Sequence, residues 1–193
     1  MKIILASKSP RRKELLHTIV ESFEIIEAVN DEIIKDNLTN AEQSEHLSFE
    51  KANEVFNKTD GDRIVIGSDT IVVVDDVIYG KPKDEKHAFE MLKILSGNTH
   101  QVITGLCILS EINGVKSCYI DHDTALVKFV KMEDQEILDY INSKEPMDKA
   151  GSYGVQGKGG KFIENINGSF YTIMGLPIHL VYQQLKNLEI FKN

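Results

Sequence analysis

The sequence predicts an α/β fold, in which strands and amphipathic helices alternate along the chain. Three features predict it: β-branched apolar runs, helical spacing of apolar residues in other segments, and helix-capping residues at the boundaries. At 193 residues, 41% hydrophobic and 27% charged, the chain can bury a core and is long enough for one domain or a two-lobed one. Because no repeat or low-complexity linker interrupts it, we expect a single domain over residues 1–193.

The first third of the chain predicts one strand and two helices. Residues 2–6 are an apolar strand, and Ser9 followed by Pro10 is typical of a helix start, with serine at the N-cap. Thr39 and Glu42 have the spacing of a capping box, so a second helix follows them.

The middle of the chain predicts a hairpin, a helix and a second hairpin. Residues 63–80 contain two apolar runs around a turn at Asp75–Asp76, and a helix begins near Asp84 and ends at Gly97. Residues 100–109 are apolar on both faces, which predicts a central strand, and Asn113–Gly114 is a type I′ turn into a strand over 115–120.

The last third continues this alternation. Residues 124–130 predict a further strand, and a helix begins near Glu133. Residues 161–168 and 169–175 are expected to form another pair of strands, and Pro177 begins a last helix.

Charge and cysteine content exclude several classes of protein. A net charge of −8 and a pI near 5.3 argue against general binding to nucleic acid or to an anionic membrane surface. The sequence contains no apolar run of membrane-spanning length and no signal peptide, so we expect a cytoplasmic protein. Cys107 and Cys118 lack metal-ligand spacing and are expected to stay reduced.

Cations occupy an unusual place at the first helix start. Arg11, Arg12 and Lys13 fill the first turn, where the positive end of the helix dipole favours acidic residues. Either these side chains simply point into water, or a polyanion binds there between the guanidinium groups, the backbone N–H groups and the hydroxyls of Ser7 and Ser9. The second reading describes a phosphate site.

Asp69 is a carboxylate within one of the most apolar stretches of the chain, "IVIGSDTIVVV". Because burial of a lone charge is costly, Asp69 either helps to turn the chain at Ser68 or is paired with a cation or metal ion. The neighbouring Thr70 is either a hydroxyl donor or an ordinary strand residue.

Three further charged residues have two interpretations each. Glu32 is either a solvated loop charge or, if it meets a partner such as Asp69, a metal ligand. Lys51 on its helix and Lys81 before Pro82 are either surface lysines or phosphate ligands.

The glycine-rich segment "AGSYGVQGKGGKF" matches neither a P-loop nor a dinucleotide-binding fingerprint. It is either a mobile surface loop or a binding loop in which Tyr153 and Gln156 present a ring and an amide to a base. Residues 121–124, "DHDT", are expected to form a polar strand edge rather than a metal site, because adjacent side chains alternate between faces.

Several blocks resemble those of the Maf-like nucleotide pyrophosphatases, in the same order: "LASKSPRR", "GSDTIVV", "GKP", "LSGNTHQVITG", "EPMDKAGSYGVQG", and "INGSF" with "MGLP". The resemblance covers nearly the whole chain. It implies an elongated mixed α/β fold of the Maf and inosine-triphosphatase-like group, with flanking helices and two lobes around a cleft.

The resemblance also implies an activity, namely hydrolysis of a nucleoside triphosphate between the α- and β-phosphates with a divalent cation, Mg²⁺ or Mn²⁺. The block "AGSYGVQG" is similar to that of the branch acting on dTTP and UTP. Carried over by position, Arg11, Thr70 and Gln156 are the specificity residues and Asp69 is the proton acceptor.

By the same resemblance, Glu32 and Asp69 hold the metal, and four cations neutralise the triphosphate: Arg11, Arg12, Lys51 and Lys81. Whether Asp69 deprotonates water or only orients it beside the metal stays open, since metal-bound carboxylates are poor bases. Homodimers are common among oligomers in general and in this family, so a homodimer is a candidate oligomeric state. Modified pyrimidine nucleotides are further candidate substrates for a housekeeping pyrophosphatase. The alternative is a regulatory protein of cell division that acts by binding a partner or nucleic acid.

Overall fold

The computed structural model describes residues 1–30 and 33–191. The chain divides into two compact units. Unit 1 comprises Met1–Asp69, Thr104–Asp123 and Gly175–Asn193, and unit 2 comprises Thr70–Ile103 and Thr124–Met174. The expectation of a single domain over the whole chain stays a prediction.

The strands form one mixed sheet. They are β1 (Lys2–Leu5), β2 (Glu24–Ile25), β3 (Arg63–Val74), β4 (Val77–Tyr79), β5 (Thr99–Ile112), β6 (Val115–Phe129) and β7 (Ile163–Asn167). Their order is β2-β1-β3-β5-β6-β7, and β4 pairs with β3. Strand β1 is parallel to β2 and β3, whereas β4 and β7 are antiparallel to their partners. This mixed sheet with its helices confirms the predicted α/β class.

Except for α5, the helices begin where their start signals predicted. They are α1 (Pro10–His17), α2 (Asn40–Asn57), α3 (Glu85–Leu95), α4 (Asp134–Asn142), α5 (Phe170–Met174) and α6 (Ile178–Asn187), with short 3₁₀ turns at Glu145–Asp148, Ala150–Ser152 and Lys158–Phe162. Ser9 caps α1, Thr39 and Glu42 form the capping box of α2, and Asp84 caps α3. Among the described residues, no helix combines the length and apolarity needed to cross a membrane.

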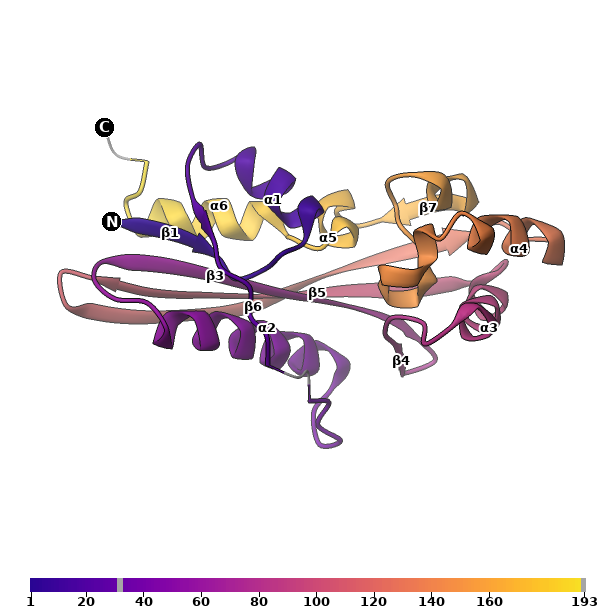
Figure 1. Cartoon of the computed structure of the whole chain (residues 1–193), viewed down its shortest axis with the longest axis horizontal. Helices are drawn as coiled ribbons and strands as arrows, with labels where there is room; N and C mark the ends of the chain where they lie inside the picture. Colours follow the sequence, from indigo (N-terminus) through magenta and orange to yellow (C-terminus); the bar gives the residue numbers. More distant parts are fainter. Residues whose placement is uncertain (31–32, 192–193) are drawn as a thin grey trace. The chain divides into compact units, whose positions relative to one another are not determined.

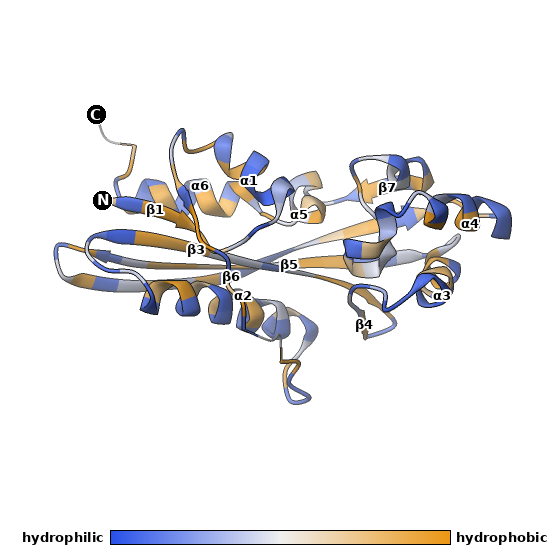
Figure 2. Cartoon of the chain, viewed as in Figure 1, coloured by the Kyte–Doolittle hydropathy of each residue, from blue (hydrophilic) through white to orange (hydrophobic). Residues whose placement is uncertain are grey.

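In unit 1, helix α2 lies on one side of the strands, and α1 and α6 lie on the other (Figure 1). Successive residues of a strand point alternately to these two sides of the sheet, because the side-chain period of a strand is two. One core cluster joins the apolar face of α2 to the strands: Ile4, Ala6, Ala52, Val55, Phe56, Val65, Cys107 and Leu109. Figure 2 shows hydrophobic and hydrophilic residues alternating along α2. Cys107 is buried, Cys118 is exposed, and neither forms a disulfide.

The core of unit 2 is rich in aromatic rings. Helices α3 and α4 contact each other, and the rings of Phe129, Tyr140, Tyr153 and Phe162 pack edge to face or tilted between them and the strands. The glycine-rich segment supplies two of these four rings. It is therefore tied into a core, and the interpretation as a mobile surface loop does not describe its buried part.

Two expectations about strands were wrong. Residues 170–174 form helix α5, with Thr172 and Met174 buried, and not a strand. A short apolar run does not distinguish the two by periodicity, and Ser169 directly before it is a residue type that favours helix starts. Residues 124–129 are the continuation of β6 and not a separate strand.

Candidate active site

The start of α1 is a polar cluster with cationic side chains. Ser9 Oγ accepts from the N–H of Arg12 at 3.4 Å, and Ser7 Oγ accepts from Ser9 N–H at 3.2 Å and from Arg12 Nη1 at 3.3 Å. In these bonds each hydroxyl accepts, so its own O–H proton can be donated to a bound anion. Arg12 does not simply point into water, because its Nε also donates to the carbonyl oxygen of Gly175 at 2.7 Å.

Strand pairing brings this helix start beside the middle of β3. Leu5 of β1 is opposite Ile66 of β3, and Ala6 N–H donates to Ile66 O at 2.8 Å, so the residues before α1 run next to those before Asp69. The hydroxyl of the buried Ser68 lies 3.0 Å from Gly175 O, the same carbonyl that Arg12 contacts. Within unit 1, the helix start and the segment of Asp69 are therefore neighbours.

Asp69 lies within a continuous strand and is paired with a cation. The strand β3 runs unbroken from Arg63 to Val74, so the interpretation of Asp69 as a turn residue is wrong. Only 5% of Asp69 is exposed, and its Oδ1 accepts from Nζ of Lys51 on α2. The pairing compensates for part of the cost of burying the carboxylate. It also shows that Lys51 is not an ordinary surface lysine.

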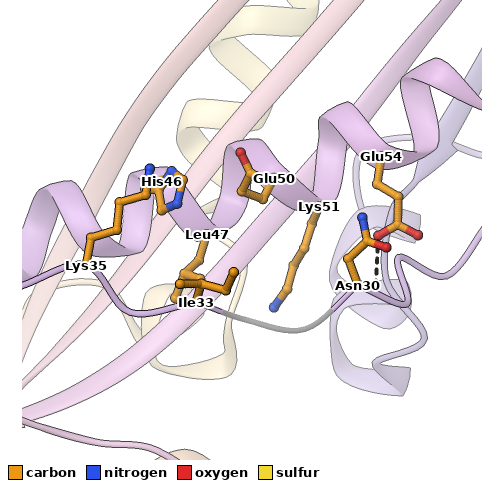
Figure 3. A pocket seen from close by; sticks show the side chains of 8 residues that line it. All are labelled: Asn30, Ile33, Lys35, His46, Leu47, Glu50, Lys51 and Glu54. Atoms are coloured by element: carbon orange, nitrogen blue, oxygen red, sulfur yellow. Dashed lines mark hydrogen bonds between the residues drawn. The ribbon is translucent and has the colours of Figure 1, made fainter.

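Lys51 also projects into a pocket between α2 and the preceding loop (Figure 3). The described residues that line it are Asn30, Ile33, Lys35, His46, Leu47, Glu50, Lys51 and Glu54. The cavity has a volume of about 150 Å³. Pockets that enclose whole small-molecule ligands are roughly 300–1,000 Å³, so this one can take a part of a nucleotide at most.

Two buried polar residues of α2 hold the loop on either side of this pocket. Glu54 accepts from the N–H groups of Val29 and Asn30 at 3.0–3.1 Å, and Gln43 Oε1 accepts from Lys35 N–H at 2.8 Å. Our sequence interpretation did not identify either residue. The sequence could have indicated both, because Gln43 and Glu54 are polar residues on the buried side of α2, where the helical spacing predicts apolar ones.

Glu54 also makes the fold sensitive to acid. Burial raises the pKa of Glu54, but the Lys58 ammonium at 2.5 Å and the two backbone N–H groups outweigh it and hold the pKa at about 2. A depressed folded-state pKa stabilises the protein above the unfolded value near 4.5, and this contribution is lost as the pH falls toward 2.

We therefore expect Glu54→Gln to lower the melting temperature at pH 7, with the gap to the wild type narrowing between pH 4.5 and pH 2. The measurement is thermal unfolding followed by circular dichroism across this range, with the exposed Glu164→Gln as the matched control. A gap that stays constant with pH would contradict the assignment.

Glu32, which we expected to hold metal, lies outside the described residues.

The remaining predicted residues belong to unit 2. Thr70 is half-buried on β3, and the exposed Lys81 follows β4. Gly80 O accepts from Gly151 N–H at 3.0 Å, so the chain that carries Lys81 is bonded to the glycine-rich segment. Gln156 lies exposed in that segment.

Tyr153 does not present its ring to a ligand. It is 5% exposed, and its hydroxyl lies 2.7 Å from Nε2 of the buried His100. Burial lowers the pKa of His100 to about 4, so the imidazole is neutral at physiological pH. The expectation that Tyr153 offers a ring to a base was wrong for this structure, because the ring is part of the core of unit 2.

A group with metal-ligating atoms lies elsewhere in unit 1. Glu45, Asp121 and His122 offer carboxylate and imidazole atoms within 4.8 Å of one another. We expected residues 121–124 to be only a polar edge, and Glu45 from α2 could not be associated with them from the sequence. In the structure, His122 Nδ1 lies 2.6 Å from Glu45 Oε1, and Asp121 Oδ2 accepts from the Tyr119 hydroxyl at 2.8 Å. These bonds account for the group without an ion.

Fold and site together describe a mixed α/β protein in which a helix start with serine hydroxyls and cationic side chains lies beside a buried carboxylate–lysine pair. The sequence matches the family described as Maf-like protein over residues 2–188. The chain belongs to this family.

Three similar proteins are named dTTP/UTP pyrophosphatase. The one from Clostridium perfringens (strain 13 / Type A) is 45% identical over 191 residues, covering 98% of both chains. That from Aquifex aeolicus is 46% identical, covering 98% of this chain and 97% of the relative, and that from Clostridium novyi is 47% identical, covering 95% of each.

Among solved structures, a nucleoside-triphosphatase / dITP/XTP pyrophosphatase from Mycobacterium abscessus aligns with a TM-score of 0.47 and 13% identity over 100% of this chain and 99% of that one. This similarity is too low to carry an argument about fold or function.

Proposed function

We propose that this protein is a nucleoside triphosphate pyrophosphatase that hydrolyses dTTP and UTP to the monophosphate and pyrophosphate. The observation that carries the proposal is the placement of the α1 start, with its serines and arginines, beside the Asp69–Lys51 pair. The choice of substrate is supported by relatives that are 45–47% identical to this chain and are named dTTP/UTP pyrophosphatase.

Phosphate binding is assigned to the helix start and two lysines. The hydroxyls of Ser7 and Ser9 donate to phosphate oxygens, and the guanidinium groups of Arg11 and Arg12 neutralise their charge. A guanidinium has five N–H donors, so the bonds of Arg12 to Gly175 and Ser7 fix its plane while leaving it a cation for the substrate. Lys51 and Lys81 neutralise further charge, including that which develops on the leaving pyrophosphate.

Asp69 is assigned to the attacking water. A buried carboxylate can hold water in line with the α-phosphorus and accept its proton, and the bond from the Lys51 ammonium orients the carboxylate. If a hard divalent cation, Mg²⁺ or Mn²⁺, binds, Asp69 and Glu32 would be its oxygen ligands, and Asp69 would then orient the water rather than accept its proton. Such a cation supplies charge neutralisation at the phosphate oxygens when bound.

Base selection is assigned to Gln156, with Arg11 and Thr70 as further specificity residues. An amide can present a donor and an acceptor together, which matches the O4 and N3–H edge of thymine or uracil. We expect Gln156→Ala to reduce kcat/KM for dTTP and UTP about 10-fold to 100-fold while slow turnover of purine nucleotides changes little. The measurement is steady-state kinetics on a nucleotide panel. Equal losses on all nucleotides would mean that Gln156 does not read the base.

The proposed activity is tested by a pyrophosphate-release assay on dTTP, UTP, dCTP, dATP and dGTP with Mg²⁺ or Mn²⁺. We expect release of pyrophosphate, fastest from dTTP and UTP. Orthophosphate as the first product, or no turnover by folded protein, would contradict the proposal. No observation favours the alternative of a regulatory protein that binds a partner or nucleic acid.

Partners and compartment follow from the same proposal. The substrate is a nucleoside triphosphate, and the acidic net charge of −8 argues against a stable nucleic-acid or membrane partner. A cytoplasmic location gives access to this substrate. A homodimer is the oligomeric state we propose to test first, by light scattering, because two-fold dimers are the commonest oligomers.

A further inference from the structure

One hydrogen-bond network in unit 2 holds the start of the loop that carries Gln156. The N–H of Gly154 donates to the Tyr140 hydroxyl at 3.2 Å, and this hydroxyl donates to Oε1 of Glu145 at 2.9 Å. Tyr140 is 2% exposed, and its hydroxyl both accepts from Gly154 and donates to Glu145. The Tyr140 hydroxyl therefore connects the carboxylate of Glu145 to the backbone of Gly154 by two hydrogen bonds.

The same carboxylate holds the end of the loop. Glu145 Oε2 accepts from Lys158 N–H at 2.9 Å, and Oε1 accepts from Gly159 N–H at 3.1 Å. The two ends of the loop over residues 154–159 are thus joined through the side chains of Tyr140 and Glu145, with the exposed Gln156 between them. We call Tyr140, Glu145 and these bonds the Tyr140–Glu145 network.

Two glycines of the loop are required by this network. A Cβ at Gly157, whose φ is +93°, would lie 2.8 Å from Glu145 Oε2, and a Cβ at Gly159 would lie 2.5 Å from the Tyr140 hydroxyl. The backbone therefore approaches both side chains as closely as it can. The sequence suggested that these glycines let N–H groups approach a ligand, but the N–H groups named above already donate within the protein.

The bonds to Glu145 are charge-assisted. Burial opposes ionisation of Glu145, but the N–H groups of Lys158 and Gly159 and the Tyr140 hydroxyl outweigh it and lower the pKa of the carboxyl. Hydrogen bonds to an ionised acceptor are about twice as strong as neutral ones, so the loop is held firmly at neutral pH. Lys149 Nζ adds a bond to the backbone carbonyl of Glu145 at 2.6 Å.

We propose that Tyr140 and Glu145 are positioning residues for base selection, because they fix the loop from which Gln156 meets the base. This inference rests on the proposed function. A glutamine amide can rotate and has a flexible stem, so its selectivity depends on a backbone held to within about 0.5 Å. The network supplies that restraint through its bonds to the loop backbone.

The test uses Tyr140→Phe and Glu145→Gln in the full chain, with kcat/KM measured for dTTP, UTP, dCTP and dATP. The phenylalanine removes only the hydroxyl, and the glutamine turns an amide N–H₂ toward backbone donors. We expect the ratio of dTTP to dATP turnover to fall about 10-fold in each variant, since small misplacements of a contacting group have effects of this order. If the substitutions only destabilised the fold, they would lower the fraction of active protein and leave the ratio of dTTP to dATP turnover unchanged.

A double-mutant cycle sharpens the test. If the network acts through Gln156, Tyr140→Phe causes no further fall in the ratio when Gln156→Ala is already present. Hydrogen exchange at residues 154–159 should become faster in both single variants. Tyr182→Phe and Glu164→Gln, on exposed residues, are the matched controls and should leave the ratio and the exchange unchanged.

The outcomes distinguish failure of the positioning role from failure of the proposed function. A wild-type protein that selects dTTP, with unchanged ratios in both network variants, would overturn the positioning role and leave the proposed function intact. A folded wild type without triphosphate turnover would overturn the proposed function and the positioning role with it.

Discussion

Asp69→Asn is expected to lower kcat for dTTP hydrolysis about 10³-fold, because an amide can neither accept the proton of the attacking water nor bind a divalent cation as strongly as a carboxylate. The loss should appear in kcat more than in KM, since the phosphate contacts at the start of α1 remain. Steady-state kinetics at saturating Mg²⁺ measure both.

The same substitution should change stability little. Asparagine has the shape of aspartate, and the Lys51 side chain is 18% exposed, so its ammonium can turn to water when its partner is neutralised. We expect the melting temperature to stay within a few degrees. Asp75→Asn, in the β3–β4 turn where φ is +48° and asparagine is well tolerated, is the matched control and should retain full activity. Retained turnover in Asp69→Asn would remove Asp69 from the reaction.

Gly67→Ala is expected to have the largest effect on stability. A Cβ at this position would lie 2.3 Å from Ser48 O and 2.7 Å from Ala52 N, which are backbone atoms of α2 and cannot rotate away. Helix α2 must then move off β3, and we expect a loss of at least about 3 kcal/mol, or roughly 6–12 °C in melting temperature for a chain of this size.

Activity should fall together with stability in this variant. Gly67 is two residues before Asp69, and Ala52 directly follows Lys51, so the close approach of α2 to β3 also brings Lys51 to Asp69. Gly80→Ala is the matched control, because a Cβ there meets no atom within 4 Å. Its melting temperature should equal that of the wild type. Full activity in Gly67→Ala would show that the helix need not sit so close to the strand.

The sequence predicted the parts of the fold that depend on local chemistry. Caps such as Ser9 and Thr39 and the Asn113–Gly114 turn act within a few residues, so they predicted the starts of α1 and α2 and the β5–β6 hairpin. Helix α5 was missed because five residues are too few to separate a period of 3.6 from a period of 2.

The candidate site was predictable in its residue types but not in its pairings. The apolar setting of Asp69 indicated that it needs a partner, yet nothing in the sequence selected Lys51 over other lysines. Arg12 was expected at a helix start, but its bond to Gly175 joins residues 163 positions apart. Such contacts depend on strand register and helix packing, which local patterns do not specify.

The supporting residues were the hardest to predict. Tyr140 and Glu145 hold a loop through backbone N–H groups, and acceptors of this kind leave no periodic pattern in the sequence. Glycines within strands, such as Gly67, do carry a signal, because they mark places where another backbone approaches closely.

Hydrolysis of dTTP in water enriched in ¹⁸O, with mass analysis of both products, tests the central claim most directly. If water held at Asp69 attacks the α-phosphorus, the label enters the monophosphate and the pyrophosphate carries none. Label in pyrophosphate or in orthophosphate would place the attack at another phosphorus and contradict the account.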